Sequence, residues 1–264
     1  MAKPFKNTNP VGDLVSVMKK LRSDKGCPWD REQTHKTLKK YLVEESAELM
    51  DAIDDNDKEG ICEELGDLLM HIVFHSQIAS ENRDFDFEDV AEKITRKMIR
   101  RHPHVFAGKK VGNSEAVIKM WDEIKKDEKK KRKSLLDGVP RHLPSLLRAH
   151  EIQRKAAKVG FDWNNSRQII EKIEEEISEL KNAVRKGDDA EINEEIGDLL
   201  FSVVNLARYR NTESAEDIMT RTIQKFERRF RYIEKKLAKI NKNPESSSLD
   251  EMEKLWIEAK KKGL

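Results

Sequence analysis

A set of four carboxylates occurs twice in this chain of 264 residues, with the same spacing in both copies. Within each set the intervals are 3, 16 and 3 residues, and the two sets are 131 residues apart. Clustered oxygen ligands are what a hard divalent cation such as Mg2+ requires, and Mg2+ commonly also binds substrate phosphates. The eight residues are Glu45, Glu48, Glu64 and Asp67 in the first half, and Glu176, Glu179, Glu195 and Asp198 in the second.

Each set is also symmetric along the chain, about Asn56 in the first half and Gly187 in the second. If helices flank a reversal at these residues, the two acid pairs face each other across an antiparallel helix pair, because residues three apart share a helix face. Converging carboxylates repel one another unless a positive charge lies among them. The alternative is a solvated acidic face, which is the usual place for acidic residues. Identical spacing in two copies, each beside an apolar stripe, favours the metal site.

The residue types also indicate which metal. Di-iron helical bundles use a Glu followed three residues later by His, whereas Glu64 and Glu195 are both followed at that position by Asp. His71 lies four residues after Asp67, but its counterpart in the second half is Ser202. We therefore expect an all-oxygen site for Mg2+, with Mn2+ as the alternative, rather than iron or zinc.

Helical periodicity covers most of the chain and predicts an all-α fold. The high content of charged residues (39%) and the low content of aromatic residues (6%) suit long exposed helices better than a sheet sandwich. The segment 26–30 is predicted to be a loop because of its Gly and Pro, and a short polar turn is predicted at 54–60. Helices are expected at residues 13–21, 34–55, 61–80, 87–101, 114–133, 142–158, 168–186, 189–209, 217–239 and 250–262.

The duplication predicts two domains, residues 1–135 and 136–264, joined where a charge run meets Asp137-Gly138-Val139-Pro140. The net charge of +2 makes nucleic acid an unexpected partner, since such binders are usually clearly basic. Two cysteines, Cys27 and Cys62, are too few for a disulfide framework, which fits a reducing cytoplasm. The chain starts without an apolar signal core and has no apolar run long enough to cross a bilayer, so we expect a cytoplasmic protein without a membrane partner.

Basic residues downstream of the second acidic set are suited to binding phosphate. Lys225, Arg228 and Arg229 lie on one predicted helix, and Lys225 and Arg229 share a face because they are four apart. They could hold phosphates that the metal bridges. The alternative is a solvated basic helix with ion pairs to Glu227. Trp256, in the last predicted helix, is either a core residue or a platform for a nucleobase.

The chain resembles the MazG nucleotide pyrophosphohydrolases, whose signature is an E-E-x-x-E motif followed by E-x-x-D. Both halves carry the signature, and the flanking blocks look like those of the bacterial two-domain members. The resemblance covers essentially the whole chain after roughly the first ten residues. The matching segments are Glu44-Glu45-Ser46-Ala47-Glu48 with Glu64-Leu65-Gly66-Asp67, Glu175-Glu176-Ile177-Ser178-Glu179 with Glu195-Ile196-Gly197-Asp198, and the blocks 26–30, 100–106, 159–163 and 225–229.

The resemblance implies an all-α enzyme of tandem helical domains, with four-helix-bundle-like cores that dimerisation completes. A homodimer agrees with the physics, because a lone two-helix hairpin cannot bury its apolar stripe. The implied reaction is Mg2+-dependent hydrolysis of nucleoside triphosphates to the monophosphate and pyrophosphate, by attack of water on the α-phosphorus. The family is linked to nucleotide-pool cleansing and to stress-related nucleotide control.

The resemblance also gives roles to individual residues, most of them in the second half. Both acidic sets become metal ligands, and Glu175, Glu176 and Glu179 become catalytic, with Glu175 placed to take the proton of the attacking water. The expected nucleotide-binding residues are Lys172, Ile173, Glu174, Glu175, Glu176, Glu191, Ile192, Asn193, Glu194, Asp198, Lys225, Phe226, Glu227, Arg228, Arg229 and Trp256.

The basic blocks suggest which half is the more active. In the first half Lys97, Arg100 and Arg101 run into His102-Pro103, whereas 225–229 continues in a predicted helix. A continuous helix holds its side chains more firmly, so we expect the second half to be the more active. Two other classes of protein remain open: a non-catalytic helical interaction protein, and a phosphohydrolase that releases orthophosphate.

Overall fold

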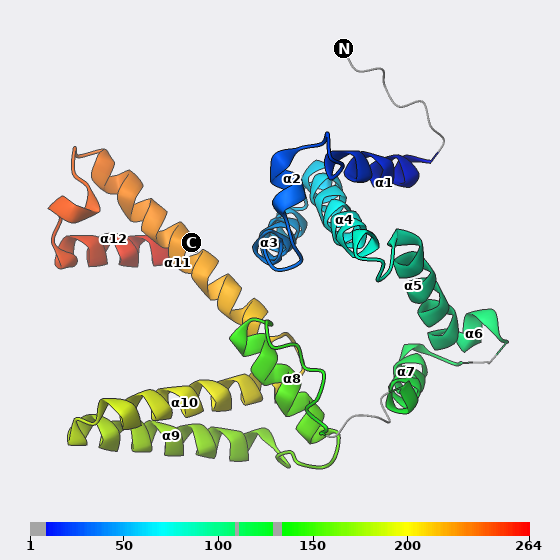
Figure 1. The fold of residues 1–264 in the computed structure, drawn as a ribbon. Coiled ribbons are helices and arrows are strands. Elements are labelled where there is room, and N and C mark those ends of the chain that lie inside the picture. The colour runs from blue at the N-terminus through cyan, green and yellow to red at the C-terminus, as the bar shows by residue number, and fades with distance from the viewer. Residues whose placement is uncertain (1–8, 109–110, 129–133) are drawn as a thin grey trace. The chain divides into compact units, whose positions relative to one another are not determined.

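The computed structural model describes residues 9–108, 111–128 and 134–264, and within them it contains helices and no strand (Figure 1). The expected all-α fold is therefore confirmed. The chain divides into two compact units, Met1–Lys129 and Lys130–Leu264. The first unit contains α1 (Pro10–Leu21), α2 (Pro28–Glu32), α3 (Lys39–Asp54), α4 (Lys58–Glu81), α5 (Phe87–Arg101), α6 (Pro103–Phe106) and α7 (Ser114–Glu128). The second contains α8 (Ser145–Ala157), α9 (Ser166–Lys186), α10 (Asp189–Arg210), α11 (Ala215–Ala238), the 3-10 helix η1 (Pro244–Ser246) and α12 (Leu249–Lys261).

Each unit contains an αα-hairpin that reverses at the centre of its acidic set. Between α3 and α4 the chain turns through Asn56, whose φ is 55°. Between α9 and α10 it turns through Gly187, whose φ is 73°. Both are residue types that reach the left-handed region at low cost. An Asp then begins the next helix in each case: Asp57 accepts a hydrogen bond from Glu59 N (3.1 Å), and Asp188 caps α10 in the same way.

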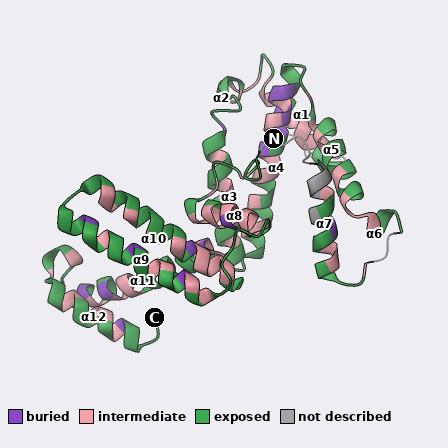
Figure 2. Ribbon diagram, turned by 90° about the horizontal axis from the view of Figure 1, so that it is seen from below, coloured by how far each residue is buried: buried purple, intermediate pink, exposed green. Residues whose placement is uncertain are grey.

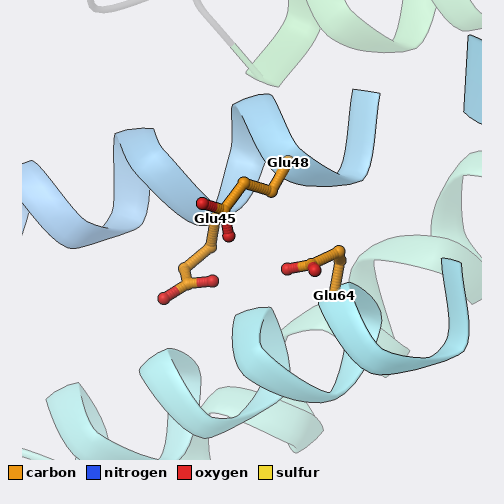
Figure 3. A group of neighbouring side chains, drawn as sticks. All are labelled: Glu45, Glu48 and Glu64. Atoms are coloured by element: carbon orange, nitrogen blue, oxygen red, sulfur yellow. The ribbon is translucent and has the colours of Figure 1, made fainter. Parts of the chain in front are cut away.

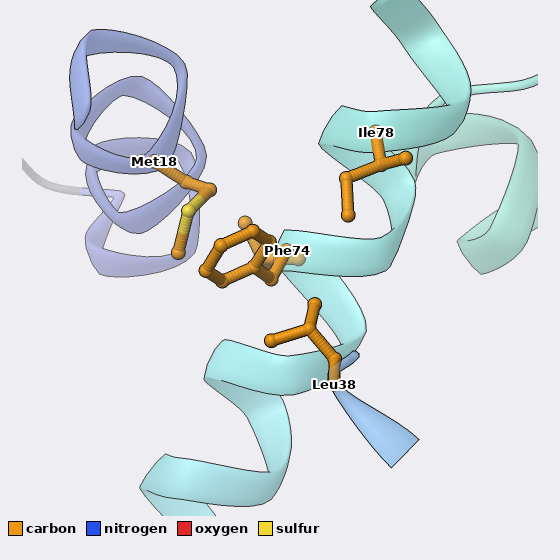
Figure 4. Packing of buried hydrophobic residues seen from close by; sticks show 5 residues of the cluster. Met18, Leu38, Phe74 and Ile78 are labelled. Atoms are coloured by element: carbon orange, nitrogen blue, oxygen red, sulfur yellow. The ribbon is translucent and has the colours of Figure 1, made fainter. Parts of the chain in front are cut away.

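The core of the first unit forms where α1 and the residue before α3 pack on the second half of α4 (Figure 4). Met18, Leu38 and Phe74 interdigitate there, and each is almost fully buried. The guanidinium of Arg22 lies over the ring of Phe74, 5.4 Å from its centroid, and pairs with Glu81 at 2.7 Å. This core fixes the second half of α4, and thereby the carboxylates about two turns before it on the same helix.

The second unit consists of two helical hairpins joined at α8. Helix α8 packs on α10, and Gln153 Nε2 donates to the backbone carbonyl of Phe201 at 2.8 Å. Helices α11 and α12 pack on each other through buried Ile233, Leu237 and Ala259. The start of α11 contacts α8, where Leu147 N donates to a carboxylate oxygen of Glu216. The α9–α10 hairpin is thus held at its open end.

Much of both acidic hairpins and of α11 is exposed (Figure 2). The exposed positions include large apolar side chains. A two-helix layer has no second layer to cover these faces. The exposed residues include Val43, Met50, Ile53, Leu65 and Ile72 in the first hairpin, Val184, Ile196, Leu200 and Val203 in the second, and Ile218, Met219, Ile223 and Phe226 on α11. No helix among the described residues has both the length and the apolar character needed to span a bilayer.

Several predicted boundaries differ from the structure. The helix expected from His142 begins at Ser145, since the residue before Pro144 is kept out of the helical region. Helix α4 begins at Lys58, inside the turn expected at 54–60. The expected loop at 26–30 is wrong beyond Cys27, because Pro28 occupies the first position of α2, where its fixed φ suits a helix and its missing N–H costs nothing. The helix expected from Thr34 begins only at Lys39, since Thr34 and Thr37 bond each other's backbone and hydroxyl groups and stabilise a turn instead. The last residues of the helix expected at 114–133, after Glu128, lie outside the described residues.

Candidate active site

The first acidic hairpin brings three carboxylates together. Glu45 and Glu48 project from α3 towards Glu64 on α4, and one oxygen of each lies within 4.8 Å of the others (Figure 3). We call these three residues the first acidic cluster. Glu64 Oε2 is buried and has no hydrogen-bond partner. An unsatisfied buried oxygen among like charges is an arrangement that a bound cation would relieve.

Electrostatics in the first acidic cluster disfavour the charged state of two of its members, Glu45 and Glu64. Burial raises the pKa of Glu45, and the charges of Asp67 and Glu48 raise it further. Burial also raises the pKa of Glu64, again with contributions from Glu48 and Asp67. Asp67 thus lies close enough to act on the cluster, as its spacing predicts. A divalent cation among these oxygens would reverse the effect.

The second hairpin repeats the arrangement with Glu176, Glu179 and Glu195, the second acidic cluster, whose oxygens also lie within 4.8 Å of one another. Glu176 is buried, with 4% of its surface exposed. Burial raises the pKa of Glu195, followed by the charges of Glu179, Glu176 and Asp198. The register symmetry seen in the sequence therefore corresponds to convergence of these side chains in both hairpins.

The two clusters differ in the residue beside two carboxylates at equivalent positions, Glu45 in the first cluster and Glu176 in the second. In the second, Lys172 Nζ lies 2.9 Å from Glu176 Oε1 and 3.0 Å from Glu175 Oε1, and these carboxylates raise the pKa of Lys172. In the first, His71 Nε2 lies 3.9 Å from Glu45 Oε1. His71 is buried, and this burial lowers its pKa.

A cavity of about 930 Å3 opens beside the second acidic cluster. Its walls come from α8, the segment before α9, α9 itself and α10. Glu176, Asp198 and Lys172 lie at its acidic side, and Phe161, Trp163 and Phe201 supply aromatic surface. Arg208 also lines the cavity, and its guanidinium pairs with Asp162. A cavity with a carboxylate rim and aromatic walls has the character of a small-molecule site.

The remaining predicted nucleotide-binding residues of the second hairpin lie on both sides of the cluster. Ile173 and Glu174 precede Glu176 on α9, and Glu174 is exposed. Glu191 lies near the turn, where its carboxylate pairs with Lys186 at 2.6 Å. The next predicted residues on α10, directly before Glu195, are Ile192, Asn193 and Glu194. Asn193 and Glu194 are exposed.

The basic block and Trp256 form a separate group on α11 and α12. The rings of Phe226 and Trp256 are 5.2 Å apart, and the guanidinium of Arg229 lies 5.3 Å from the ring centroid of Trp256. Arg229 also donates to the backbone carbonyl of Leu264 (2.7 Å). Glu227 pairs with Arg231 at 3.4 Å, rather than with the basic block. Among the described residues, no hydrogen bond, ion pair or ring contact joins this group to the second acidic cluster.

In the first half the corresponding basic residues have a partner on α7. Arg100 and Arg101 each place Nη2 2.6 Å from an oxygen of Glu128. These bonds lower the pKa of Glu128 to about 2. Trp121 packs edge-on against His102, with ring centroids 5.1 Å apart. The two halves thus share acidic clusters and differ in how their basic residues are engaged.

Two features of the sites were not identified from the sequence. The sequence gives no role to His71, whose counterpart is Ser202, because only the packing of α3 on α4 brings it to Glu45. The aromatic walls of the cavity include Phe161 and Trp163, which belong to a block of the family resemblance that received no role. Their place in a Gly-containing segment directly before a predicted acidic helix is the signal that the sequence offers, since functional residues often lie in loops.

Comparison with known proteins identifies relatives along the whole chain. The model of the MazG nucleotide pyrophosphohydrolase domain matches twice, at residues 33–106 and 164–233. The nucleoside triphosphate pyrophosphohydrolase of Escherichia coli (strain K12) is 43% identical over 258 residues, which are 96% of this chain and 98% of the relative. The nucleoside triphosphate pyrophosphohydrolase/pyrophosphatase MazG of Thermotoga maritima is 46% identical over 249 residues, 94% of each chain. A nucleoside triphosphate pyrophosphohydrolase of Mycobacterium tuberculosis is 39% identical over 151 residues, 56% of this chain and 45% of the relative. On these matches and the paired acidic hairpins, the chain belongs to the MazG nucleotide pyrophosphohydrolase family.

Proposed function

We propose that this protein is a Mg2+-dependent nucleoside triphosphate pyrophosphohydrolase that forms the monophosphate and pyrophosphate. The observation that carries the proposal is the convergence of Glu176, Glu179 and Glu195 beside a cavity that Asp198 also lines. Family membership and the printed names of the full-length relatives support the reaction. Control of nucleotide pools, by cleansing or in stress, is the corresponding cellular role.

The residues present fit a hard divalent cation. All the converging donors are carboxylate oxygens, which Mg2+ and Mn2+ prefer. Burial and mutual repulsion raise the pKa of Glu195 in this cluster, as they do for Glu45 and Glu64 in the first. In the proposed site Glu176, Glu179, Glu195 and Asp198 hold Mg2+. When bound, the ion supplies positive charge to phosphate oxygens and makes water more acidic.

The chain's own residues would then position the triphosphate and move one proton. Lys172, 2.9 Å from Glu176, supplies a cation at the edge of the cluster for the phosphate oxygens. Glu175 is exposed beside Glu176 and takes the proton of the water that attacks the α-phosphorus. The cavity walls at Phe161 and Trp163 accept the nucleoside by apolar contact and stacking.

We further propose that the working form is a homodimer. The exposed apolar faces of the acidic hairpins need a second helical layer, as in four-helix bundles. Within the described part of their own chain, no hydrogen bond, ion pair or ring contact joins the basic block at 225–229 or Trp256 to the second acidic cluster. Phosphate contacts from Lys225, Arg228 and Arg229 therefore fit a site assembled from two copies.

We propose that the acidic site of the second half contributes more of the pyrophosphohydrolase activity than that of the first half. In the first half Arg100 and Arg101 are both engaged by Glu128. In the second half Lys225 and Arg228 are exposed on a helix that continues to Ala238. The two cysteines are free thiols, which fits the proposed cytoplasmic location.

Product analysis of ATP and dGTP turnover tests the proposed reaction. Monophosphate and pyrophosphate in equal amounts, formed only with Mg2+ or Mn2+, are the expected products. Diphosphate with orthophosphate would show a phosphohydrolase of another bond. Absence of turnover, together with no Mg2+-dependent thermal stabilisation by nucleotide, would favour an interaction protein.

A further inference from the structure

His71 is a buried polar side chain for which the fold provides no hydrogen bond. It is 2% exposed, and neither ring nitrogen has a hydrogen-bond partner. Burial of a polar group without a partner costs free energy, so such a group in a folded protein calls for a reason. Its Nε2 points to the first acidic cluster and lies 3.9 Å from Glu45 Oε1, too far for a hydrogen bond.

This separation is compatible with two ligands of one metal ion. Bonds from nitrogen or carboxylate oxygen to a metal such as zinc are about 2.0–2.2 Å long, so two donor atoms on one ion are at most about 4.4 Å apart. Glu45 in turn has an oxygen within 4.8 Å of oxygens of Glu48 and Glu64. His71 Nε2 therefore adds a nitrogen donor atom next to Glu45 to the oxygen donors of the first acidic cluster.

The second half has different residues at the two positions that decide which donors lie beside Glu45 and Glu176. The position of His71 is taken by Ser202, and the position of Tyr41 is taken by Lys172. Lys172 places an ammonium against Glu176, and an ammonium cannot bind a metal. Tyr41 instead packs edge-on against Trp29. Within the described residues, the first cluster thus has a nitrogen donor and no lysine beside Glu45, whereas the second has a lysine beside Glu176 and no nitrogen donor.

We propose that the first acidic cluster is a mixed nitrogen–oxygen site, in which His71 Nε2 joins Glu45 as a ligand and selects a transition metal ion such as Co2+ or Zn2+ over Mg2+. Imidazole is a good ligand for these ions, whereas Mg2+ strongly prefers oxygen. The inference rests on the proposed metal-binding role of the first acidic cluster. It makes the two halves different metal sites rather than two copies of one.

The test uses the full chain carrying Glu176→Gln and Glu179→Gln, so that the second acidic cluster does not contribute. Calorimetric titrations with Co2+ and with Mg2+ are compared with and without His71→Gln. We expect His71→Gln to weaken Co2+ binding by about tenfold or more and Mg2+ binding by no more than about twofold. His75→Gln is the matched control, because His75 pairs with His35 (2.7 Å) one helical turn away and should leave both affinities unchanged.

A second measurement keeps His71 in place and covers the case in which His71→Gln does not fold. Pulsed electron paramagnetic resonance of the Mn2+-loaded background protein, and of its His75→Gln form, should show coupling to a histidine nitrogen. Equal losses of Co2+ and Mg2+ affinity, or no nitrogen coupling, would overturn the inference. Neither readout uses turnover, so a protein that binds Co2+ through His71 but forms no pyrophosphate would contradict only the proposed function.

Discussion

Lys172 Nζ lies 2.9 Å from Glu176 Oε1, so the buried carboxylate of the second acidic cluster has a cation of its own chain beside it. A metal ion that binds Glu176 competes with this ammonium. In the proposed site, a bound ion would free this ammonium to contact the phosphates of the substrate. Lys172 would then couple metal binding to substrate binding.

Lys172→Met should therefore tighten Mg2+ binding without nucleotide by about fivefold, which corresponds to about 1 kcal/mol for the lost competition. It should also raise KM for the triphosphate, because a phosphate contact is lost. Calorimetry and steady-state kinetics measure the two effects. Lys181→Met, an exposed change on the same helix, should alter neither. Unchanged or weaker Mg2+ binding in Lys172→Met would contradict this competition.

Gly197 lies inside α10 between Glu195 and Asp198, and a Cβ there would meet no atom within 4 Å. Within its own chain nothing requires the glycine, which costs a helix about 0.5–1 kcal/mol relative to Ala. Gly197→Ala should therefore stabilise the metal-free fold by up to that amount in denaturant titrations. It should also lower turnover on the order of tenfold, because in the proposed dimeric enzyme this open space would be filled by substrate or by the second copy.

Gly66→Ala is the matched control for that change, since Gly66 holds the equivalent place in α4 and also has open space around it. The same gain in stability is expected there, with turnover retained. Full activity of Gly197→Ala would show that the glycine has no role in the site.

If the proposed homodimer forms through the exposed apolar face of α10, a charge introduced on that face should break the dimer. Leu200 is 48% exposed, and burying a charge there against a partner would be costly. Leu200→Glu should convert the protein to a monomer in sedimentation velocity and abolish most turnover. Asn182→Glu, an exposed polar position on α9, should leave the dimer intact. A monomeric wild-type protein with full activity would contradict the proposal.

Much of the fold follows from the sequence because its determinants are local. The acids are symmetric about Asn56 and Gly187, and these two residues do adopt positive φ at the turns. What escapes prediction depends on packing between elements. His71 reaches Glu45 only through the contact of α3 with α4, and the position of the basic block on α11 depends on tertiary or quaternary packing rather than on helix periodicity. Pro28 can either end a loop or begin a helix, and the sequence does not choose between them.

Glu128 provides a pH-dependent contribution to the stability of the first unit. Arg101 and Arg100 lower its pKa to about 2 from an ordinary value of 4.5. A lowered pKa in the folded state means stability that is present above pH 4.5 and is lost as the pH falls towards 2. Glu128→Gln should therefore cost about 1 kcal/mol or less at pH 7, since water screens such pairs.

Unfolding free energies of wild type and Glu128→Gln measured from pH 7 to pH 3 check this expectation. The difference between the two proteins should shrink as the pH falls below 4.5. A constant difference across the range would mean that the carboxylate is not held by the two arginines.

Pyrophosphate release by two paired variants tests the central claim most directly. Glu176→Gln with Glu179→Gln should lower kcat/KM for the triphosphate by about 100-fold or more, because the proposed metal ligands of the more active half are lost. Glu45→Gln with Glu48→Gln should retain most of the turnover. Turnover that survives the first pair, or that only the second pair abolishes, would contradict the account.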